Sequence, residues 1–446
     1  MTAKNKNKPS SGFGSIAALL VLTCILCAAC GRQHRPEITI RFWNGFTGPD
    51  GRPMQQMVKQ FNRENPDIRI IMQRMDWYTY YNKLFVAGIG GRAPEVFIVH
   101  ASNIPRFMQA DFLRPVDDLL ENEMGLDKND FFAPAWNAAT CEGKQYGIPL
   151  DISIHGMYYN KALFREAGIV DEAGQARPPR NRTEFMDALR KLTLDKDGDG
   201  DIDQWGFVFT NIRNNVLTLM NQFGGLFFDR DNRQCLLNSE GNVRALTWCR
   251  DLIHQEKLAP SPENFIAWLG FRQGNVAMAF EGIYMLADLK KQTDLEFGVA
   301  PIPMIGEQNA TMASSHIVCL RRDLKDAELE AASRFIRFLT DRSLDWAEAG
   351  QVPARLSLLE TERFRAMEAQ STFAQQLNHI FYEPNQPFNN QFDTEFNDAV
   401  EKALRNSESP QTALDRAVEK TDQAIRRHEE LWGQAKNSPA RNGEGL

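Results

Sequence analysis

Between residues 37 and 99, the chain alternates between short apolar strands and amphipathic helices. Residues 37–42, 68–72 and 95–99 have the length and apolar content of strands, whereas residues 54–65 and 80–87 carry apolar side chains at helical spacing. The order strand–helix–strand–helix–strand is typical of a sheet that helices cover on both faces. The pattern therefore predicts an α/β fold for this part of the chain.

The length of the chain predicts two lobes. The chain has 446 residues, of which 43% are hydrophobic and 24% are charged, a composition typical of a globular protein. Because domains usually contain about 100–200 residues, this chain should bury at least two cores. Residues 148–158 form an extended stretch between Pro149 and Gly156, which suits a hinge strand that crosses between lobes. Further strands are predicted at residues 297–302 and 317–320, and further helices at residues 183–192, 243–253, 327–339, 393–404 and 410–431.

The amino-terminal segment has the pattern of a secretion signal. Three lysines within the first eight residues precede an apolar run at residues 16–26, which is too short to span a membrane as a helix of the folded protein. Residues 26–31 resemble the lipobox of bacterial lipoproteins, in which Cys30 would carry the lipid. The alternative is an ordinary signal peptide that is cleaved at Ala28 or Ala29. Both interpretations predict an exported protein.

Net charge and cysteine content narrow the choice of protein class. The formal net charge of -7 argues against the broad basic surface that a nucleic-acid-binding protein needs. Four cysteines lie beyond Cys30, at positions 141, 235, 249 and 319. Cys235 and Cys249 could form one disulfide, or all four could be buried thiols, and the sequence leaves both possibilities open.

The sequence lacks the common motifs of nucleotide-binding and hydrolytic enzymes. It contains no Gly-rich loop ending in Lys-Ser/Thr, no GxGxxG after a strand, no HExxH and no GxSxG. The seven histidines are scattered, and no two stand at the spacing of metal ligands. A catalytic pair of carboxylates remains possible, because pairs that meet only in space are invisible in a sequence.

Several short stretches occur in the order of one known family. Pro149-Leu150-Asp151, then Gly156-Met157-Tyr158-Tyr159-Asn160, then Phe164 and Glu166 resemble the signature of family 1 extracellular solute-binding proteins, the sugar-capturing partners of bacterial ABC importers. Four further stretches follow in the family's order, at residues 271–282, 297–301 and 331–339 and at Gly350 with Pro353. The resemblance runs from about residue 38 to the final helix.

The resemblance implies a two-lobed α/β fold of the periplasmic-binding-protein type, with hinge strands between the lobes. It implies a monomeric, lipid-anchored binding protein without catalysis, which takes a mono- or oligosaccharide into an interlobe cleft and passes it to a membrane permease. No cofactor is required. We expect a lipoprotein signal peptide at residues 1–29, a linker at 30–36, a first lobe at 37–150 and 298–325, a second lobe at 151–297 and 326–433, and a flexible tail at 434–446.

A sugar presents both a C–H face and hydroxyls, so its binding site needs flat apolar rings together with polar groups. Stretches of the chain that combine both are candidates. In open α/β sheets ligands bind beyond the carboxyl ends of the strands, which selects Trp43, Asn44, Asp76, Trp77, Tyr80, His100, Ser102 and Asn103. The family resemblance adds Tyr284, Trp268 and an aromatic residue of the last lobe, either Phe392 or Phe396. Three acids, Asp76, Asp151 and Glu281, would make the cleft acidic.

Residues 195–203 resemble the start of an EF-hand calcium loop. Carboxylates occupy its first, third, fifth, seventh and ninth places, and a glycine occupies the sixth, where the loop turns sharply. The twelfth place is Gly206 rather than glutamate, so the bidentate ligand of an EF-hand is missing. In the calcium loop that some solute-binding proteins carry, the residue at the tenth place contributes a ligand. The predicted ligands of a structural calcium ion are thus Asp195, Asp197, Asp199, Asp201, Asp203 and Gln204, and a solvated acidic turn is the alternative.

Two other functions remain open at this point. A secreted glycan-active enzyme, such as a lyase or a glycosidase, would need an acid and a base in the cleft, for example Asp76 or Asp151. The same fold could also bind a polyamine, a phosphate ester or a peptide. An acidic cleft would favour a cation, whereas an arginine there would favour an anion.

Overall fold

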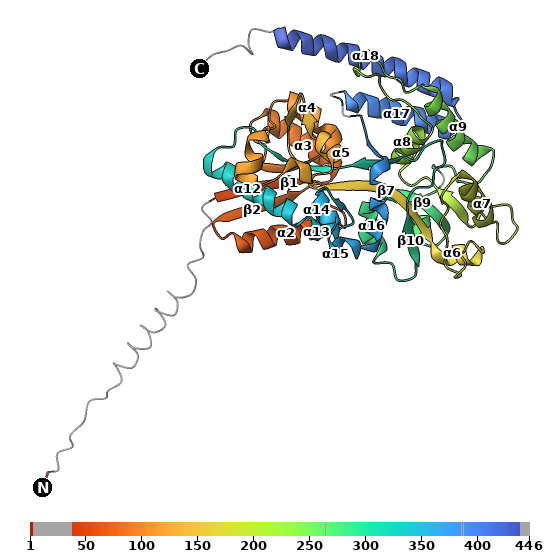
Figure 1. The fold of residues 1–446 in the computed structure, drawn as a ribbon, viewed down its shortest axis with the longest axis horizontal. Coiled ribbons are helices and arrows are strands. Elements are labelled where there is room, and N and C mark those ends of the chain that lie inside the picture. The colour runs from red at the N-terminus through yellow and green to blue at the C-terminus, as the bar shows by residue number, and fades with distance from the viewer. Residues whose placement is uncertain (3–37, 264, 385, 387, 438–446) are drawn as a thin grey trace.

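The computed structural model describes residues 1–2, 38–263, 265–384, 386 and 388–437. It has two α/β lobes, and strand β7 (Asp151–Asn160) runs from the junction between them into the second lobe (Figure 1). The predicted signal peptide, the linker and Cys30 lie outside the described residues, apart from residues 1 and 2. No described helix combines the length and the apolar content that crossing a membrane requires.

The first lobe is built on a five-stranded sheet in the order β2-β1-β3-β12-β6. Its strands are β1 (Ile38–Asn44), β2 (Ile68–Arg74), β3 (Val96–His100), β6 (Ile148–Pro149) and β12 (His316–Leu320). The strands β1, β2 and β3 are parallel, whereas β12 runs antiparallel to β3 and β6. The main helices of this lobe are α2 (Gly51–Glu64), α3 (Trp77–Ile89), α4 (Ile104–Gln109), α5 (Ala133–Asn137), α12 (Asp326–Asp341) and α13 (Ser343–Ala347), and a small hairpin joins β4 (Thr140–Cys141) to β5 (Lys144–Gln145).

The second lobe is built on a sheet in which β7 is the central strand. Its path is β14-β11-β7-β9-β8, and β10 and β13 also pair with β7. These strands are β8 (Trp205–Val208), β9 (Val276–Gly282), β10 (Phe297–Ala300), β11 (Thr311–Ser314), β13 (Val352–Pro353) and β14 (Ile380–Tyr382). The helices are α6 (Lys161–Glu166), α7 (Arg182–Leu192), α8 (Ile212–Gln222), α9 (Glu240–His254), α10 (Ala267–Arg272), α11 (Leu286–Leu289), α14 (Leu356–Leu359), α15 (Glu362–Arg365), α16 (Glu368–Ala374), α17 (Asn389–Leu404) and α18 (Pro410–Asn437).

Two adjacent antiparallel strands carry the chain between the lobes. Only Leu150 separates β6 in the first sheet from β7 in the second, and only Ser315 separates β11 in the second sheet from β12 in the first. The two crossings are joined by a backbone hydrogen bond of 2.9 Å from the Leu150 N–H to the His316 carbonyl. The predicted hinge at residues 148–158 is therefore an extended stretch at the lobe junction.

Apolar side chains form separate cores on the faces of the two sheets. One cluster packs α3 and α4 against β1, β3 and β12, a second packs α7, α8, α9 and α17 against the second sheet, and a third covers the opposite face of the first sheet and continues along β7. Phe335 of α12 belongs to the third cluster, where its ring contacts Phe42 at 5.2 Å and Phe61 at 5.1 Å.

The structure differs from the expected boundaries in three places. Strands β10 and β11 pair with β7, so only the part of the segment 298–325 that begins at β12 lies in the first lobe. Helices α12 and α13, which were assigned to the second lobe, belong to the first. Helix α12 covers the first sheet because its apolar face needs the partner that Phe42 and Phe61 provide, and Trp346 of α13 packs on Phe46. Residues 434–437, expected in a flexible tail, continue helix α18.

The four described cysteines are free thiols, so Cys235 and Cys249 form no disulfide.

Candidate functional site

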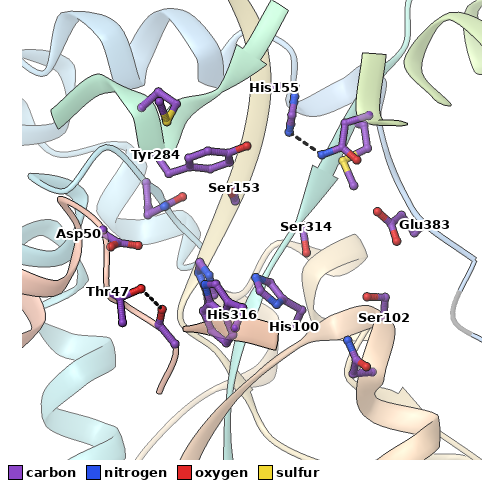
Figure 2. Close-up of a pocket in the computed structure, with 18 of the residues that line it drawn as sticks. Thr47, Asp50, His100, Ser102, Ser153, His155, Tyr284, Ser314, His316 and Glu383 are labelled. Carbon is purple, nitrogen blue, oxygen red and sulfur yellow. Dashed lines mark hydrogen bonds between the residues drawn. The ribbon is translucent and has the colours of Figure 1, made fainter. Parts of the chain in front are cut away.

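A cavity of about 530 Å³ lies between the lobes, beside the two crossing strands (Figure 2). We call it the central cavity. The first lobe contributes the loop at residues 45–50, Trp77, the strand end at His100 and the residues Ser102 and Asn103 that follow it. The second lobe contributes Asn214, Tyr284, Met285, Met312 and Glu383, and the crossing strands contribute Ser153, His155, Ser314 and His316.

Trp77 is the aromatic ring that the first lobe supplies. It is the first residue of α3, whose amino terminus is capped by the Asp76 carboxylate, which accepts a 3.0 Å hydrogen bond from the Thr79 N–H. A Cβ atom at Gly45 would lie 2.1 Å from the Trp77 ring, so this ring can pack only on a glycine. The buried Tyr80 holds α3 against the sheet, because its hydroxyl donates a 2.6 Å hydrogen bond to the Ile98 carbonyl.

Tyr284 is the aromatic ring that the second lobe supplies. Its hydroxyl donates a 2.8 Å hydrogen bond to the carboxylate of the buried Glu281 and accepts one of 3.1 Å from the Asn211 amide. A Cβ atom at Gly282 would lie 2.0 Å from this ring, so Tyr284 packs on a glycine as Trp77 does. Glu281 thus orients the ring that lines the cavity and does not line it itself.

A buried ionic network holds the lobe junction together beneath the cavity. The Asp151 carboxylate is fully buried and accepts hydrogen bonds from the His316 N–H at 3.0 Å, from His316 Nδ1 at 2.7 Å and from Trp346 Nε1 at 2.6 Å. Burial opposes a charge on His316, but attraction and hydrogen bonding to Asp151, together with attraction to Asp50, outweigh it and raise the pKa of this imidazole. The His316 ring also faces the cavity, where it stacks on Trp77 at 5.7 Å.

The other two histidines of the cavity have lowered pKa values. Burial, reinforced by repulsion from His316, holds the pKa of His100 well below its usual value, and burial lowers the pKa of His155 to about 4. His100 Nδ1 is paired with the Tyr81 hydroxyl at 2.5 Å. His155 Nε2 is paired with the Asn214 amide at 3.0 Å, which is the dashed line that begins at His155 in Figure 2.

Acidic groups give the cavity its charge. Asp50 and Glu383 line it from opposite lobes, and none of the described residues that line it is a lysine or an arginine. Burial raises the pKa of Asp50. Glu383 forms an ion pair with Arg213 of α8, and Arg213 also pairs with Asp393 at 2.6 Å. Helix α8 thus fixes the position of the Glu383 carboxylate.

Several polar atoms around the cavity have no partner within the described part of the chain. They are Oδ1 of Asp50, Nδ1 of His155, and both Oε1 and Nε2 of Gln351. Buried polar atoms are normally hydrogen-bonded, so unpaired ones on the wall of a cavity indicate a ligand or water. The set contains both donors and acceptors, as a partner rich in hydroxyls would require.

Five of the predicted ligand-binding residues line the central cavity: Trp77, His100, Ser102, Asn103 and Tyr284. Strand ends were the useful signal for four of these residues. Six other polar residues that line the cavity were not predicted from the sequence: Asp50, His155, Asn214, His316, Gln351 and Glu383. The sequence predicted that the strand around residue 151 crosses between the lobes. It did not indicate which distant segments would lie beside that strand.

The structure places the other eight candidates outside the cavity. Successive residues of a strand point to opposite faces, so Trp43 packs toward α3 while the buried Asn44 accepts a hydrogen bond from the Phe46 N–H. Trp268 stacks on Phe271 at 5.6 Å and donates to Asp288, and Phe392 is buried in the second core, as is Phe396. The remaining four have the structural roles described above: Asp76, Tyr80, Asp151 and Glu281.

The acidic loop brings together three of its predicted ligands. Carboxylate oxygens of Asp195, Asp197 and Asp203 lie within 4.8 Å of one another. The loop is closed by the bridge between Leu194 and Gln204. The buried Gln204 amide donates to the Leu192 carbonyl at 3.0 Å, and Asp199, Asp201 and Gln204 are outside the three-carboxylate group.

Comparison with known proteins places this architecture in a family. The chain is 23% identical over 424 residues to the sn-glycerol-3-phosphate-binding periplasmic protein UgpB of Escherichia coli (strain K12), which covers 88% of this chain and 93% of that protein. The fold of this chain matches that of the substrate-binding protein Lmo0181 of Listeria monocytogenes, solved with cycloalternan. The TM-score is 0.76 and the identity 23%, and the match covers 89% of this chain and 99% of that chain. It also matches the maltodextrin-binding domain MalE of Bdellovibrio bacteriovorus, solved with maltotriose, with a TM-score of 0.74, 24% identity and coverage of 87% and 100%. The family model for bacterial extracellular solute-binding proteins matches residues 47–343, and the chain belongs to this family.

Proposed function

We propose that the protein binds an uncharged carbohydrate in the central cavity and delivers it to the permease of an ABC importer. Solved structures with this fold hold cycloalternan and maltotriose, which are both carbohydrates. We further propose that it acts without catalysis, because binding followed by lobe movement is all that delivery requires.

The observation that carries this proposal is the combination of rings and unpaired polar atoms in one cavity. Trp77 and Tyr284 offer flat apolar surfaces from opposite lobes. Asp50 Oδ1 can accept a hydroxyl hydrogen, and the Gln351 amide can both donate and accept. A sugar fits both features at once, because its C–H face packs on a ring while its hydroxyls act as donors and acceptors.

The charge of the cavity separates a sugar from a phosphate ester. A phosphate site normally presents arginine, lysine or a helix amino terminus to the anion. Helices α2 and α3 begin at the cavity wall, but acidic residues, Asp50 and Asp76, occupy their N-cap positions. Here the charged groups that face the cavity are two acids and a histidine already paired with Asp151. We therefore favour a neutral ligand over one like sn-glycerol 3-phosphate, which is the ligand named for UgpB.

We propose that Cys30 carries a lipid and that residues 1–29 are removed during export. The basic start, the short apolar run and the small residues before Cys30 support this proposal. Labelling of cells with a clickable fatty acid should tag the native protein and should not tag the Cys30→Ala variant. Equal labelling of both would contradict lipidation at this residue.

We propose that the loop at residues 195–203 binds calcium as a structural ion. Three converging carboxylates offer the hard oxygen ligands that Ca²⁺ prefers, and Asp195, Asp197 and Asp203 would hold it. The ion would offset the repulsion among acids in this loop, and it has no role in the carbohydrate site.

Titration calorimetry with a carbohydrate panel tests the main proposal. We expect saturable heat for at least one neutral saccharide and none for sn-glycerol 3-phosphate. Trp77→Ala should reduce affinity about tenfold or more, whereas Trp268→Ala, the matched removal of an indole outside the cavity, should change it less than about twofold. No heat from any saccharide, or equal losses in the two variants, would overturn the proposal.

A further inference from the structure

A second cavity opens beside the central one. Its volume is about 350 Å³, and we call it the side cavity. Ser102, Ser314 and Glu383 line both cavities, so the two spaces meet at these residues. In Figure 2 these three side chains lie on one side of the central cavity, with Tyr284 on the other.

The residues at this junction are held in place by contacts from the second lobe. Glu383 is paired with Arg213 of α8. The carbonyl of Ser102, on the first lobe, accepts a 2.9 Å hydrogen bond from the Asn389 amide of α17. The passage between the cavities is thus framed by both lobes.

The wall of the side cavity combines flat apolar groups with polar ones. Tyr382 of β14 lines it from the second lobe, and Pro105 and Pro134 line it from the first. The ring of the neighbouring Phe381 stacks on Phe227 and packs against the second core. Asn137 supplies an amide that is exposed to solvent. Rings together with hydrogen-bonding groups are also the features by which the central cavity suits a sugar.

The side cavity borders a third hollow on the first lobe. Pro134, Asn137 and Thr140 also line a depression of about 1410 Å³ on the first lobe, which we call the outer depression. The half-buried rings of Phe132 and Trp136 lie in its wall. The side cavity and the outer depression therefore adjoin along α5.

We propose that the ligand is an oligosaccharide chain that lies across both cavities and leaves through the outer depression. This inference rests on the proposed function and adds the length of its ligand. The central cavity alone has the size of a typical small-molecule site, for which about 300–1,000 Å³ is usual. A chain of roughly three or more sugar units uses all three spaces, with one unit against Trp77 and Tyr284 and a further unit against Tyr382.

Length series of saccharides test this inference on the mature, full-length protein. Calorimetry would compare gluco-, xylo-, manno- and galacto-oligosaccharides of one to six units. In a series that binds, the tri- and longer saccharides should bind about tenfold or more tightly than the disaccharide. A mono- or disaccharide that binds as tightly as the hexasaccharide would overturn the extended site and leave the proposed function intact. Failure of every saccharide to bind would instead overturn the proposed function, and the extended site with it.

A variant at the boundary between the side cavity and the outer depression gives a second readout. Asn137→Trp places a large ring at an exposed position that borders both the side cavity and the outer depression, so it should obstruct a long chain without disturbing the core. We expect it to weaken the longest saccharide about tenfold and to change the shortest binding saccharide less than about twofold. Asn137→Ala is the control, and it should weaken the longest saccharide much less. Unchanged binding of the longest saccharide to Asn137→Trp would overturn the extended site.

Discussion

Removing the Asp151 carboxylate should destabilise the protein far more than removing an exposed carboxylate. In the folded protein three donors converge on this fully buried group: the His316 N–H, His316 Nδ1 and Trp346 Nε1. Asp151→Ala leaves all three without their acceptor. Each stranded buried donor costs about 1–3 kcal/mol, and loss of one partner from a buried ion pair costs about 3–5 kcal/mol. We therefore expect the free energy of unfolding to fall by about 3–5 kcal/mol.

Urea unfolding, followed by tryptophan fluorescence, measures this change. Asp76→Ala is the control, because its exposed carboxylate accepts from one backbone N–H as a helix cap, whose loss costs about 1 kcal/mol. Asp151→Asn keeps one acceptor oxygen and should lie between the two. If Asp151→Ala lost no more stability than Asp76→Ala, the network at the lobe junction would not be the stabilising element that its geometry indicates.

The pH dependence of the same measurement isolates the charge of His316. Its pKa is raised in the folded state, so the stabilising effect of its charge is fully present below the unfolded pKa of about 6.5 and is lost as pH rises through the folded value. The stability difference between the native protein and Asp151→Asn should therefore shrink as the pH rises above about 6.5. A difference that stays constant as the pH rises would contradict a stabilising charge on His316 that is lost by titration.

Three further perturbations have defined outcomes. Gly282→Ala should displace the Tyr284 ring, from which the new Cβ would lie 2.0 Å, and lower saccharide affinity about tenfold in calorimetry, whereas Gly90→Ala outside the cavity should leave it unchanged. Burial lowers the pKa of His155 to about 4. Between about pH 6.5 and pH 4, this imidazole therefore takes up a proton in the unfolded state but not in the folded state. Stability should thus fall by up to about 3 kcal/mol over this range, and His155→Gln should reduce that fall. Removing calcium with a chelator should lower the melting temperature of the native protein but not of Asp197→Asn, as scanning fluorimetry would measure.

Local patterns in the sequence predicted the elements well where periodicity was strong. Two predicted helices illustrate this: the expected range 183–192 is observed as α7, which begins one residue earlier, and 243–253 is observed as part of α9. Both helices have a buried apolar face whose spacing is visible in the sequence. Lobe assignment failed for α12 because periodicity shows that a helix has an apolar face and does not show which sheet that face covers.

The candidate site was predictable only in part, for a related reason. The rule that ligands bind beyond strand ends found His100, Ser102 and Asn103, because that rule depends on position along a strand. It could not separate Trp77 from Trp43, since the choice between cavity and core depends on which face of the element each side chain occupies. Glu383 could not be found at all, because its place in the cavity depends on pairing between β14 and β11, whose residues are about seventy positions apart in the chain.

The pairing of the crossing strands explains why binding and lobe movement should be coupled in this molecule. Ser153 and Ser314 are register partners on adjacent strands, and both line the central cavity, as does His316 at the start of β12. A ligand in the cavity therefore touches the crossing strands in addition to Trp77 and Tyr284 on the two lobes. A change in the angle between the lobes must alter the distance between those two rings, while Asp151 keeps the strands beneath them joined. The arrangement in which both rings reach one ligand is thus the arrangement that the ligand stabilises, by its difference in affinity between the open and closed forms.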